Sequence, residues 1–368
     1  MRSLIALILA ATLNVAAPAP QDLRGAVQAV VDAGAPAAVL AVRTEEGPED
    51  VAAGVADTRT GRPASTGDRY RIASITKTFT AVLVLQLAAA RAIDLGAPIG
   101  RYVEGVPGGS RITIRDLLRH TSGLPDFYDA LGLRTSADWR RRRLERLTDD
   151  RRLSLAFGLE PAPPGAPEAT YSNTNYVLLG KLVEHVTRRP YADEVAGRII
   201  RPLRLRDTYY ADGQPAIRGR HLHGYMPGDL PGEPDADYAH LTDFTTQTVN
   251  QSGPAGSMIS TVHDLTRFYQ ALFTGRLLPP ALMRELTGTV PVRGNPLPWV
   301  RGFGLGVHRY DFGCGPVYGH IGGVRGYTGI VVSTADGRRQ AAIAVTLNPN
   351  PAAVLPAAVK AVTEAICP

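Results

Sequence analysis

The spacing of apolar and polar positions divides this chain into short strands near both ends and longer helices between them. An apolar-periodic segment over residues 21–33 predicts a helix that ends before Pro36. Two short apolar runs follow, residues 37–43 and 51–56, and the polar stretch 45–50 separates them. Strand-length apolar runs joined by a polar turn predict a β-hairpin.

The middle of the chain is expected to be helical. Residues 81–90 contain neither Gly nor Pro and are apolar except for one Gln, which predicts a buried helix. This helix opens a helical stretch that the pattern extends to residue 118. Further helices are predicted over residues 177–186, 261–273 and 280–286.

Two polar regions interrupt the helices. Between the loop 120–125 and the Pro-rich segment 161–165, the residues are charged and poorly patterned. They indicate a surface excursion with short helices. A second, Pro-rich loop zone runs from residue 211 to about residue 237.

The C-terminal part of the chain changes to strands. β-Branched and aromatic residues between Gly-rich turns predict strands over residues 302–307, 317–320, 327–333 and 340–347. A last helix is predicted over residues 352–366. Strands at both ends with helices between them indicate an α+β fold, in which one antiparallel sheet is built from both termini and flanked by helices, with an inserted helical lobe.

This layout predicts one domain over residues 20–368. Its α/β lobe would comprise about residues 20–70 and 300–368, and its helical lobe about residues 74–290. Functional groups are expected in the cleft between the two lobes.

Charge and composition narrow the range of functions. The 368 residues carry a formal net charge of +6, spread along the chain apart from the run Arg140–Arg143. No basic arm and no nucleic-acid-binding motif occurs, so nucleic acid is not predicted as a partner. The excess charge favours solubility and attraction to anionic cell-wall polymers.

The N-terminus is typical of an exported protein. Met1-Arg2 precedes an apolar run over residues 4–17, which predicts a secretory signal peptide over residues 1–19. Ala17–Ala19 fits an A-x-A cleavage site, and Val15–Ala17 is an alternative. The run is too short to span a bilayer well, and no later segment reaches the roughly 20 apolar residues that a span requires. We therefore expect a secreted, soluble protein without a membrane anchor.

The two cysteines, Cys314 and Cys367, both lie in the last part of the chain. In an exported protein an even number of cysteines permits a disulfide. Such a bond would tie the C-terminal segment to the strand region near Cys314. Two unpaired buried thiols are the alternative.

The most informative local motif is the S-x-x-K pair Ser74 and Lys77 at the start of the predicted buried helix. Residues three apart on a helix share a face. A serine hydroxyl needs a nearby base, and an amine can be that base if burial lowers its pKa. The alternative is a Ser N-cap followed by a surface Lys. The chain has only three lysines among many arginines, which favours a titratable amine at this position.

Two further motifs follow the first in order: Tyr171-Ser172-Asn173 and His320-Ile321-Gly322. Together the three motifs resemble those of the serine β-lactamase and DD-peptidase superfamily, the penicillin-recognising enzymes. The Tyr-Ser-Asn motif points to the class C-like branch. The His in the third motif is most similar to that of the soluble exocellular D-alanyl-D-alanine carboxypeptidase, whose disulfide Cys314 and Cys367 also match. The resemblance covers nearly the whole chain after residue 19.

This resemblance implies a role for each motif residue. Ser74 would be the acylated nucleophile, and Lys77 and Tyr171 would share the proton transfers, with the acylation base left open between them. Asn173 would bind the substrate amide and orient Lys77. His320 would extend the proton network towards the leaving group.

The backbone N–H groups of Ser74 and Gly323 would form the oxyanion hole. No metal and no cofactor is expected. His221, His223 and His240 lie in or beside the Pro-rich loop zone without a recognisable ligand spacing, so they do not predict a metal site.

The sequence departs from the carboxypeptidase pattern where that enzyme holds the terminal carboxylate of its substrate. His308 stands at the position of an Arg, and Ile321 and Gly323 stand at the positions of two Thr residues. Arg309, Arg325 or Arg301 could replace the lost cation. The substrate-binding candidates are therefore His308, Arg309, Ile321, Gly322 and Arg325.

The predicted function is a secreted, monomeric serine hydrolase that acts through an acyl-enzyme and reacts with β-lactams. A D-alanyl-D-alanine carboxypeptidase or DD-peptidase type is expected first, with a small molecule or a peptidoglycan peptide as substrate. A β-lactamase-related esterase and a D-amino-acid amidase or peptidase are the alternatives, because they share the motifs. A non-hydrolysing penicillin-binding protein is the remaining alternative.

Overall fold

The structure is a computed structural model that describes residues 22–228, 237–248, 251–294 and 297–367. The signal peptide predicted over residues 1–19 lies outside these ranges, as does part of the Pro-rich loop zone. Among the described helices, none combines the length and the apolarity needed to cross a bilayer.

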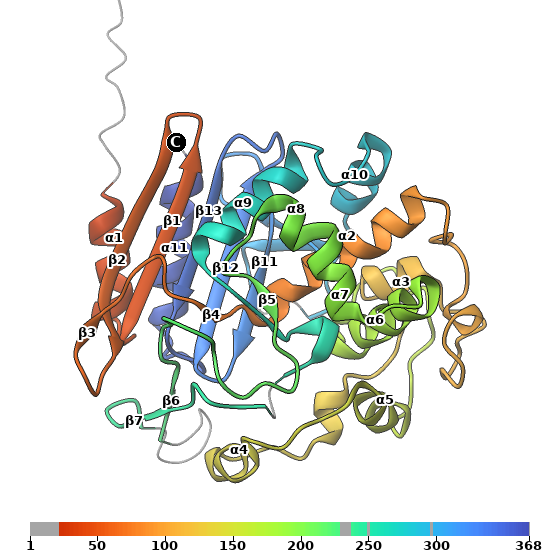
Figure 1. The fold of residues 1–368 in the computed structure, drawn as a ribbon, viewed down its shortest axis with the longest axis horizontal. Helices are drawn as coiled ribbons and strands as arrows, with labels where there is room; N and C mark the ends of the chain where they lie inside the picture. Colours follow the sequence, from red (N-terminus) through yellow and green to blue (C-terminus); the bar gives the residue numbers. More distant parts are fainter. Residues whose placement is uncertain (1–21, 229–236, 249–250, 295–296, 368) are drawn as a thin grey trace, which may run out of the picture.

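An eight-stranded antiparallel sheet forms the centre of the fold (Figure 1). Its strand order is β3-β2-β1-β13-β12-β11-β10-β9, so the N-terminal hairpin lies directly beside the last strand of the chain. In that order the strands span Arg62–Pro63, Gly47–Asp57, Ala37–Thr44, Gln340–Val345, Tyr327–Thr334, Pro316–Val324, His308–Asp311 and Val300–Phe303. The prediction of one sheet built from both ends of the chain is confirmed.

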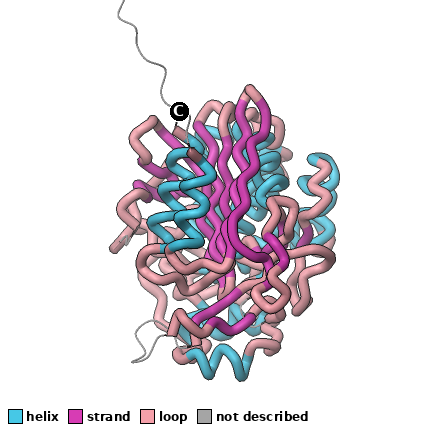
Figure 2. The backbone as a smooth tube through the Cα atoms, turned by 90° about the vertical axis from the view of Figure 1, so that its left-hand side faces the viewer, coloured by secondary structure: helices cyan, strands magenta, loops and turns pink. Residues whose placement is uncertain are grey.

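Helices cover both faces of this sheet (Figure 2). On one face, α1 (Leu23–Asp32) packs against α11 (Val354–Ile366) and both contact the strands, and on the other face α9 (Val262–Phe273) lies across β12 and β13. Strand β1 shows the reason, because its side chains alternate between two cores. Val39 and Ala41 belong to the core beneath α9, whereas Ala38, Leu40 and Val42 belong to the core beneath α1 and α11.

The helical part lies between strands β4 (Tyr70–Arg71) and β8 (Met258–Ser260) in the chain and is built around α2 (Thr76–Ala89) and α6 (Asn173–Thr187). The side chains of α2 are buried almost all round, as its apolar sequence predicts. The other helices of this region are α3 (Ile114–Leu118), α4 (Ser136–Arg142), α5 (Asp149–Phe157), α7 (Tyr191–Val195) and α8 (Arg201–Leu203), and α10 (Pro280–Thr287) follows α9.

Smaller elements complete this region. Two-residue β5 (Tyr209–Tyr210) joins β4 and β8 in a small sheet, and β6 (Tyr225–Pro227) pairs with β7 (Leu241–Asp243). Short 3₁₀ turns include η1 (Ala73–Ile75), η3 (Phe127–Ala130) and η5 (Gly253–Ala255). The predicted surface excursion with short helices is confirmed by η3, α4 and α5.

Several boundaries differ from the sequence prediction. The hairpin turn is only Glu45-Glu46, because the polar residues after it form the exposed outer end of β2. Ser74 lies in the 3₁₀ turn η1 rather than in the first turn of α2. The helical stretch ends at Ala89, and the segment between α2 and α3 is mostly turns.

The segment predicted as one strand over residues 302–307 is the end of β9 and a turn. At Gly306 the backbone φ angle is +83°, and an added Cβ atom would lie 2.3 Å from the Cβ of Ala81 on α2. Only glycine adopts this conformation without strain, and only glycine fits the contact. The chain reverses here and continues as β10, a strand that the sequence analysis did not predict separately.

The cysteines form a disulfide in the structure. Cys314, in the turn between β10 and β11, is bonded to Cys367 at the end of α11, with a Cα–Cα distance of 5.5 Å. The bond holds the last helix against one end of the sheet.

Removing this bond is expected to destabilise the protein. The bridge joins residues 53 positions apart, and the chain-entropy model gives a loss of about 4 kcal/mol when a loop of about that length is opened. The Cys314→Ser/Cys367→Ser variant should therefore show a lower urea midpoint, and its m-value should not fall, because the unfolded chain without the bond is less compact. An unchanged midpoint, together with two free thiols in the wild-type protein by peptide mapping, would contradict the pairing.

Candidate active site

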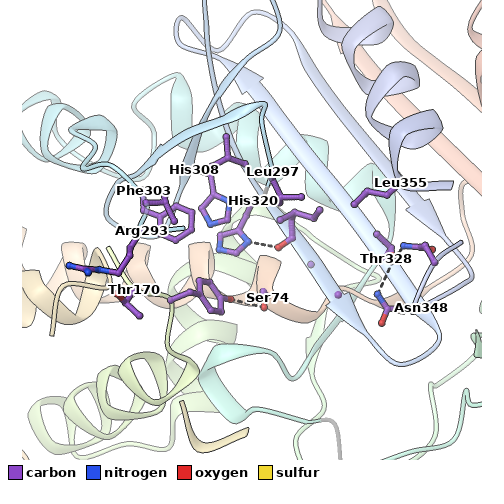
Figure 3. Close-up of a pocket in the computed structure, with 17 residues that line it drawn as sticks. Ser74, Thr170, Arg293, Leu297, Phe303, His308, His320, Thr328, Asn348 and Leu355 are labelled. Carbon is purple, nitrogen blue, oxygen red and sulfur yellow. Dashed lines mark hydrogen bonds between the residues drawn. The ribbon is translucent and has the colours of Figure 1, made fainter. Parts of the chain in front are cut away.

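A cavity of about 410 Å³ opens beside Ser74, between the start of α6 and strand β11. Figure 3 shows Arg293 at one end of this cavity and Leu355 at the other, with His308 and His320 between them. Apolar side chains that line it are Val292, Leu297, Val300, Phe303, Ile321 and Leu355. We call this space the large cavity.

A second cavity of about 70 Å³ lies on the other side of Ser74. Its polar lining comes from Tyr128, Asn173 and Ser252. Ser74 and Gly323 line both cavities, so the two residues expected to form the oxyanion hole border the same space. A carbonyl compound placed at Ser74 would extend one substituent into each cavity.

The turn that carries Ser74 has an unusual backbone. Ala73 adopts a φ angle of +47°, which a residue with a Cβ atom rarely does. Strand β11 passes close to this turn, since a Cβ atom added at Gly322 would lie 2.3 Å from the carbonyl oxygen of Ile72. Gly322 is therefore required for the approach of β11 to the nucleophile turn, which is a structural reason for a glycine in the third motif.

Lys77 is fully buried, and its amine hydrogen-bonds to groups of the protein. Its Nζ atom lies 3.2 Å from Ser74 Oγ, 2.7 Å from Asn173 Oδ1 and 2.8 Å from the carbonyl oxygen of Ala255. Burial lowers the pKa of Lys77 to about 7, although the carboxylate of Asp126 opposes this change. A neutral amine could keep its two protons on the shorter bonds and present its lone pair to the Ser74 hydroxyl.

Tyr171 approaches the same hydroxyl from the segment just before α6. Its OH group donates to Ser74 Oγ at 2.9 Å, and its ring lies 4.8 Å from Lys77 Nζ. Burial raises the pKa of Tyr171 well above its usual range, and the hydrogen bond to Ser74 offsets only part of this effect. Around neutral pH the phenol is therefore a proton donor, whereas Lys77 titrates near neutrality.

His320 lies beside Ser74, Lys77 and Tyr171, and its imidazole ring is neutral. Burial, followed by the charge on Lys77, lowers the pKa of His320 to about 3. Its Nδ1 atom lies 2.6 Å from the carbonyl oxygen of Ile321, which can only accept, so Nδ1 carries the proton. The Nε2 atom then has a free lone pair, which could accept a hydrogen bond or a proton.

His308 is also neutral, as part of an aromatic stack. Its ring lies 4.1 Å from that of His320 and 4.2 Å from that of Phe303. Burial lowers the pKa of His308 well below its usual range. Because His308 stands where the resemblance implies a permanent cation, the structure offers an uncharged ring at that point.

None of the three arginines considered as replacements lines the large cavity. Arg309 is exposed because it alternates along β10 with the buried His308. Arg301 is paired with Asp311 at 3.1 Å. The guanidinium of Arg325 lies over the ring of Trp139, and the main-chain carbonyl of Arg325 accepts from the Gln247 amide at 2.7 Å.

Several residues of the site were not found by sequence analysis. Arg293 lines the large cavity with a largely exposed side chain, 3.6 Å from Glu168. Three polar groups close the far end of the cavity: the amides of Asn348 and Asn350 both donate to the hydroxyl of Thr328. Asp126 binds Asn173. None of these residues belongs to one of the three motifs, so no local signal marked them.

The family model for Beta-lactamase matches residues 16–364. Penicillin-binding protein 4* of Bacillus subtilis (strain 168) is 28% identical over 291 residues, which cover 78% of this chain and 62% of that protein. The alignment thus spans less than two thirds of the relative's length.

Two solved structures share the fold over nearly the whole chain. The D-stereospecific amidohydrolase from Streptomyces sp. is 35% identical, with a TM-score of 0.81 and coverage of 92% of this chain and 97% of that one. The D-amino acid amidase from Ochrobactrum anthropi SV3 is 26% identical, with a TM-score of 0.81 and coverage of 93% and 96%. With a family model that spans almost all of its length and a fold shared end to end, this chain belongs to the Beta-lactamase family of serine hydrolases.

Proposed function

We propose that this protein is an exported, monomeric hydrolase that cleaves amides or esters of D-amino acids through an acyl-enzyme at Ser74. It carries out the acyl transfer of a DD-peptidase without requiring a free carboxylate on its substrate. The observation that carries the proposal is the large cavity beside Ser74, which is mainly apolar and has the neutral His308 where a cation would hold a carboxylate.

The names of the relatives support the choice of substrate class. A D-stereospecific amidohydrolase and a D-amino acid amidase match the chain over its whole fold, and a penicillin-binding protein matches much of it. D-Amino acid amides are therefore the first substrates to test, and β-lactams are the first acylating inhibitors. The predicted leader and the disulfide support export.

In the proposed mechanism, neutral Lys77 takes the proton of Ser74 as Oγ attacks the carbonyl carbon of the substrate. The backbone N–H groups of Ser74 and Gly323 stabilise the developing oxyanion. As the carbon–nitrogen bond breaks, Tyr171 OH gives its proton to the leaving amine and regains one from protonated Lys77. Water then hydrolyses the acyl-serine, with Lys77 as the base, and releases the acid and the free enzyme.

Capping the terminal carboxylate of a substrate should cost this enzyme little. A charge-assisted hydrogen bond contributes roughly 1.5–3 kcal/mol. The Arg and Thr side chains that hold the terminal carboxylate in the carboxypeptidase are replaced here by His308, Ile321 and Gly323. We expect the kcat/KM values for D-Ala-D-Ala and D-Ala-D-Ala amide to agree within about 10-fold. Burial lowers the pKa of His308 well below its usual value, so the ring gains no charge when the pH is lowered to 6. Lowering the pH to 6 should therefore not favour the free acid.

The matched control is Arg293→Ala, which removes the guanidinium that lines the large cavity. A preference of 100-fold or more for the free acid, about 2.7 kcal/mol, that disappears in this variant would restore a strict carboxypeptidase. The L-alanyl substrates form a second arm, and equal turnover of both enantiomers would contradict D-specificity. A stable β-lactam adduct with no turnover of any amide or ester would instead indicate a penicillin-binding protein.

A further inference from the structure

The loop that precedes η3 reaches across to the second motif and holds it. The hydroxyls of Ser172 and Thr174 donate to the carbonyl oxygen of Pro125, at 3.1 Å and 2.7 Å. The ring of His120 lies 4.4 Å from that of Tyr171, and its Nδ1 atom accepts from the backbone N–H of Ser172 at 3.1 Å. The start of α6 is therefore positioned by a segment some fifty residues earlier in the chain.

Asp126 makes the contact in this loop that bears on the chemistry. One carboxylate oxygen, Oδ2, accepts from Asn173 Nδ2 at 2.7 Å and from the Asn173 backbone N–H at 3.0 Å. The other oxygen accepts from the backbone N–H of Tyr128 at 3.0 Å. Burial raises the pKa of the Asp126 carboxyl, whereas these three N–H bonds and the charge on Lys77 oppose that rise and favour the ionised form. The carboxylate also satisfies a free backbone N–H group at the N-terminus of α6.

The two neighbours of the Asn173 amide permit only one orientation of that amide. Protonated Lys77 can only donate, neutral Lys77 keeps its two protons on Asn173 Oδ1 and the carbonyl oxygen of Ala255, and an ionised carboxylate can only accept. Lys77 on one side and Asp126 on the other therefore fix the carbonyl oxygen of Asn173 towards the amine and its NH₂ group towards the carboxylate. Without the carboxylate, the amide could turn and present N–H to the amine.

We propose that Asp126 is a positioning residue, which aims the Asn173 amide at Lys77 and so directs the lone pair of the amine at Ser74. The proposal rests on the proposed function, because it assigns the base of that reaction. Asp126 touches neither Ser74 nor the leaving group in this mechanism, so its effect is transmitted through Asn173.

Asp126 is also the charged group that acts on Lys77. The other titratable side chains that face the amine are Tyr171 from the segment just before α6, Tyr176 from α6, His120 from the loop, His308 from β10 and His320 from β11. Burial keeps each of these groups neutral around neutral pH. Removing the negative charge of Asp126 disfavours protonated Lys77, so the pKa of the amine should fall further.

The test compares Asp126→Asn with Asp129→Asn in the full chain with its disulfide intact. Asp129 is an exposed carboxylate in η3, three residues away, so its variant removes the same charge without touching Asn173. The probe is an alkyl fluorophosphonate, which forms an Oγ–P bond at Ser74 as fluoride leaves and the base takes the proton. The second-order labelling rate is measured from pH 5 to 9, with thermal melting alongside.

Asp126→Asn should label on the order of 10- to 100-fold more slowly at the plateau, the loss expected when a catalytic group is misaligned. The acid limb of its pH profile, the range in which the labelling rate rises as Lys77 loses its proton, should move to lower pH. A merely structural role of Asp126 would not produce this change. Asp129→Asn should retain both the rate and the limb of the wild type. Wild-type behaviour of Asp126→Asn would overturn the proposal, as would equal changes in the two variants.

A failure of the proposed function gives a different result, because the wild-type protein would then not be labelled at Ser74 at all. If Asp126→Asn does not fold, Asp126→Glu carries the test, since it keeps the charge but moves the oxygens. Its plateau rate should fall while its acid limb stays in place. An unchanged rate, or a displaced limb, in Asp126→Glu would contradict the assignment.

Discussion

Ser74→Ala should abolish acylation and reduce amide and ester turnover by on the order of 10⁴- to 10⁶-fold, the loss seen when a serine hydrolase loses its nucleophile. Ser74 Oγ is the atom on which the site converges, since Lys77 Nζ lies 3.2 Å from it and Tyr171 OH 2.9 Å. The measurement is intact mass after incubation with a penicillin and with an activated ester. The wild type should gain one acyl group, and the variant none.

The control for this result is Ser252, the other serine that lines the second cavity, of about 70 Å³. Its hydroxyl is 2.8 Å from Tyr128 OH, a phenol whose pKa burial raises to about 12, so this contact does not activate it. Ser252→Ala should keep the adduct, and peptide mapping should place the adduct on Ser74. An adduct that persists in Ser74→Ala would show that the nucleophile lies elsewhere.

Lys77→Arg should slow acylation by at least about 100-fold, the low end of the effect of removing a general base. An arginine keeps the charge but cannot give up its proton around neutral pH. In the wild type, acylation should rise with pH and level off above about 7, because burial places the pKa of Lys77 there and only the neutral amine can accept the Ser74 proton. A pH series of single-turnover acylation rates measures both effects.

Two variants separate charge from size at this fully buried position. Lys77→Met keeps the length of the side chain without an amine, and it should be as slow as Lys77→Arg. Lys181→Arg is the matched control, because Lys181 is a partly exposed lysine on α6 paired with Asp150. It should behave like the wild type. Near-native acylation by Lys77→Met would rule out Lys77 and leave Tyr171 as the base.

Contacts set by local geometry could be predicted from the sequence. Ser74 and Lys77 are three residues apart where helical structure begins, so their proximity follows from the spacing alone. The second motif lies at the start of a helix for the same kind of reason, since an apolar run follows Tyr171–Tyr176. The sheet built from both ends could likewise be predicted from strand patterns in the terminal segments.

Contacts that depend on tertiary packing could not be predicted. Asp126 reaches Asn173 from 47 positions away, and Arg293 reaches the large cavity from a turn outside the three motifs. The neutral state of His308 results from burial, and the rings of Phe303 and His320 that pack against it come from two other strands. The left-handed backbone of Ala73 was equally hidden, because alanine gives no sign of a positive φ angle.

The strand order has a consequence for when this protein becomes reactive. Strand β1 lies between β2 and β13, so the N-terminal hairpin can join the sheet only after nearly the whole chain has been synthesised. Pairings between such distant segments form late in folding, because the intervening loop must first be ordered. Ser74 follows the N-terminal hairpin in the chain, whereas Gly323 lies on β11 near the C-terminal end. We therefore expect hydrolytic activity to appear late in folding, only after the last strands have docked beside the N-terminal hairpin.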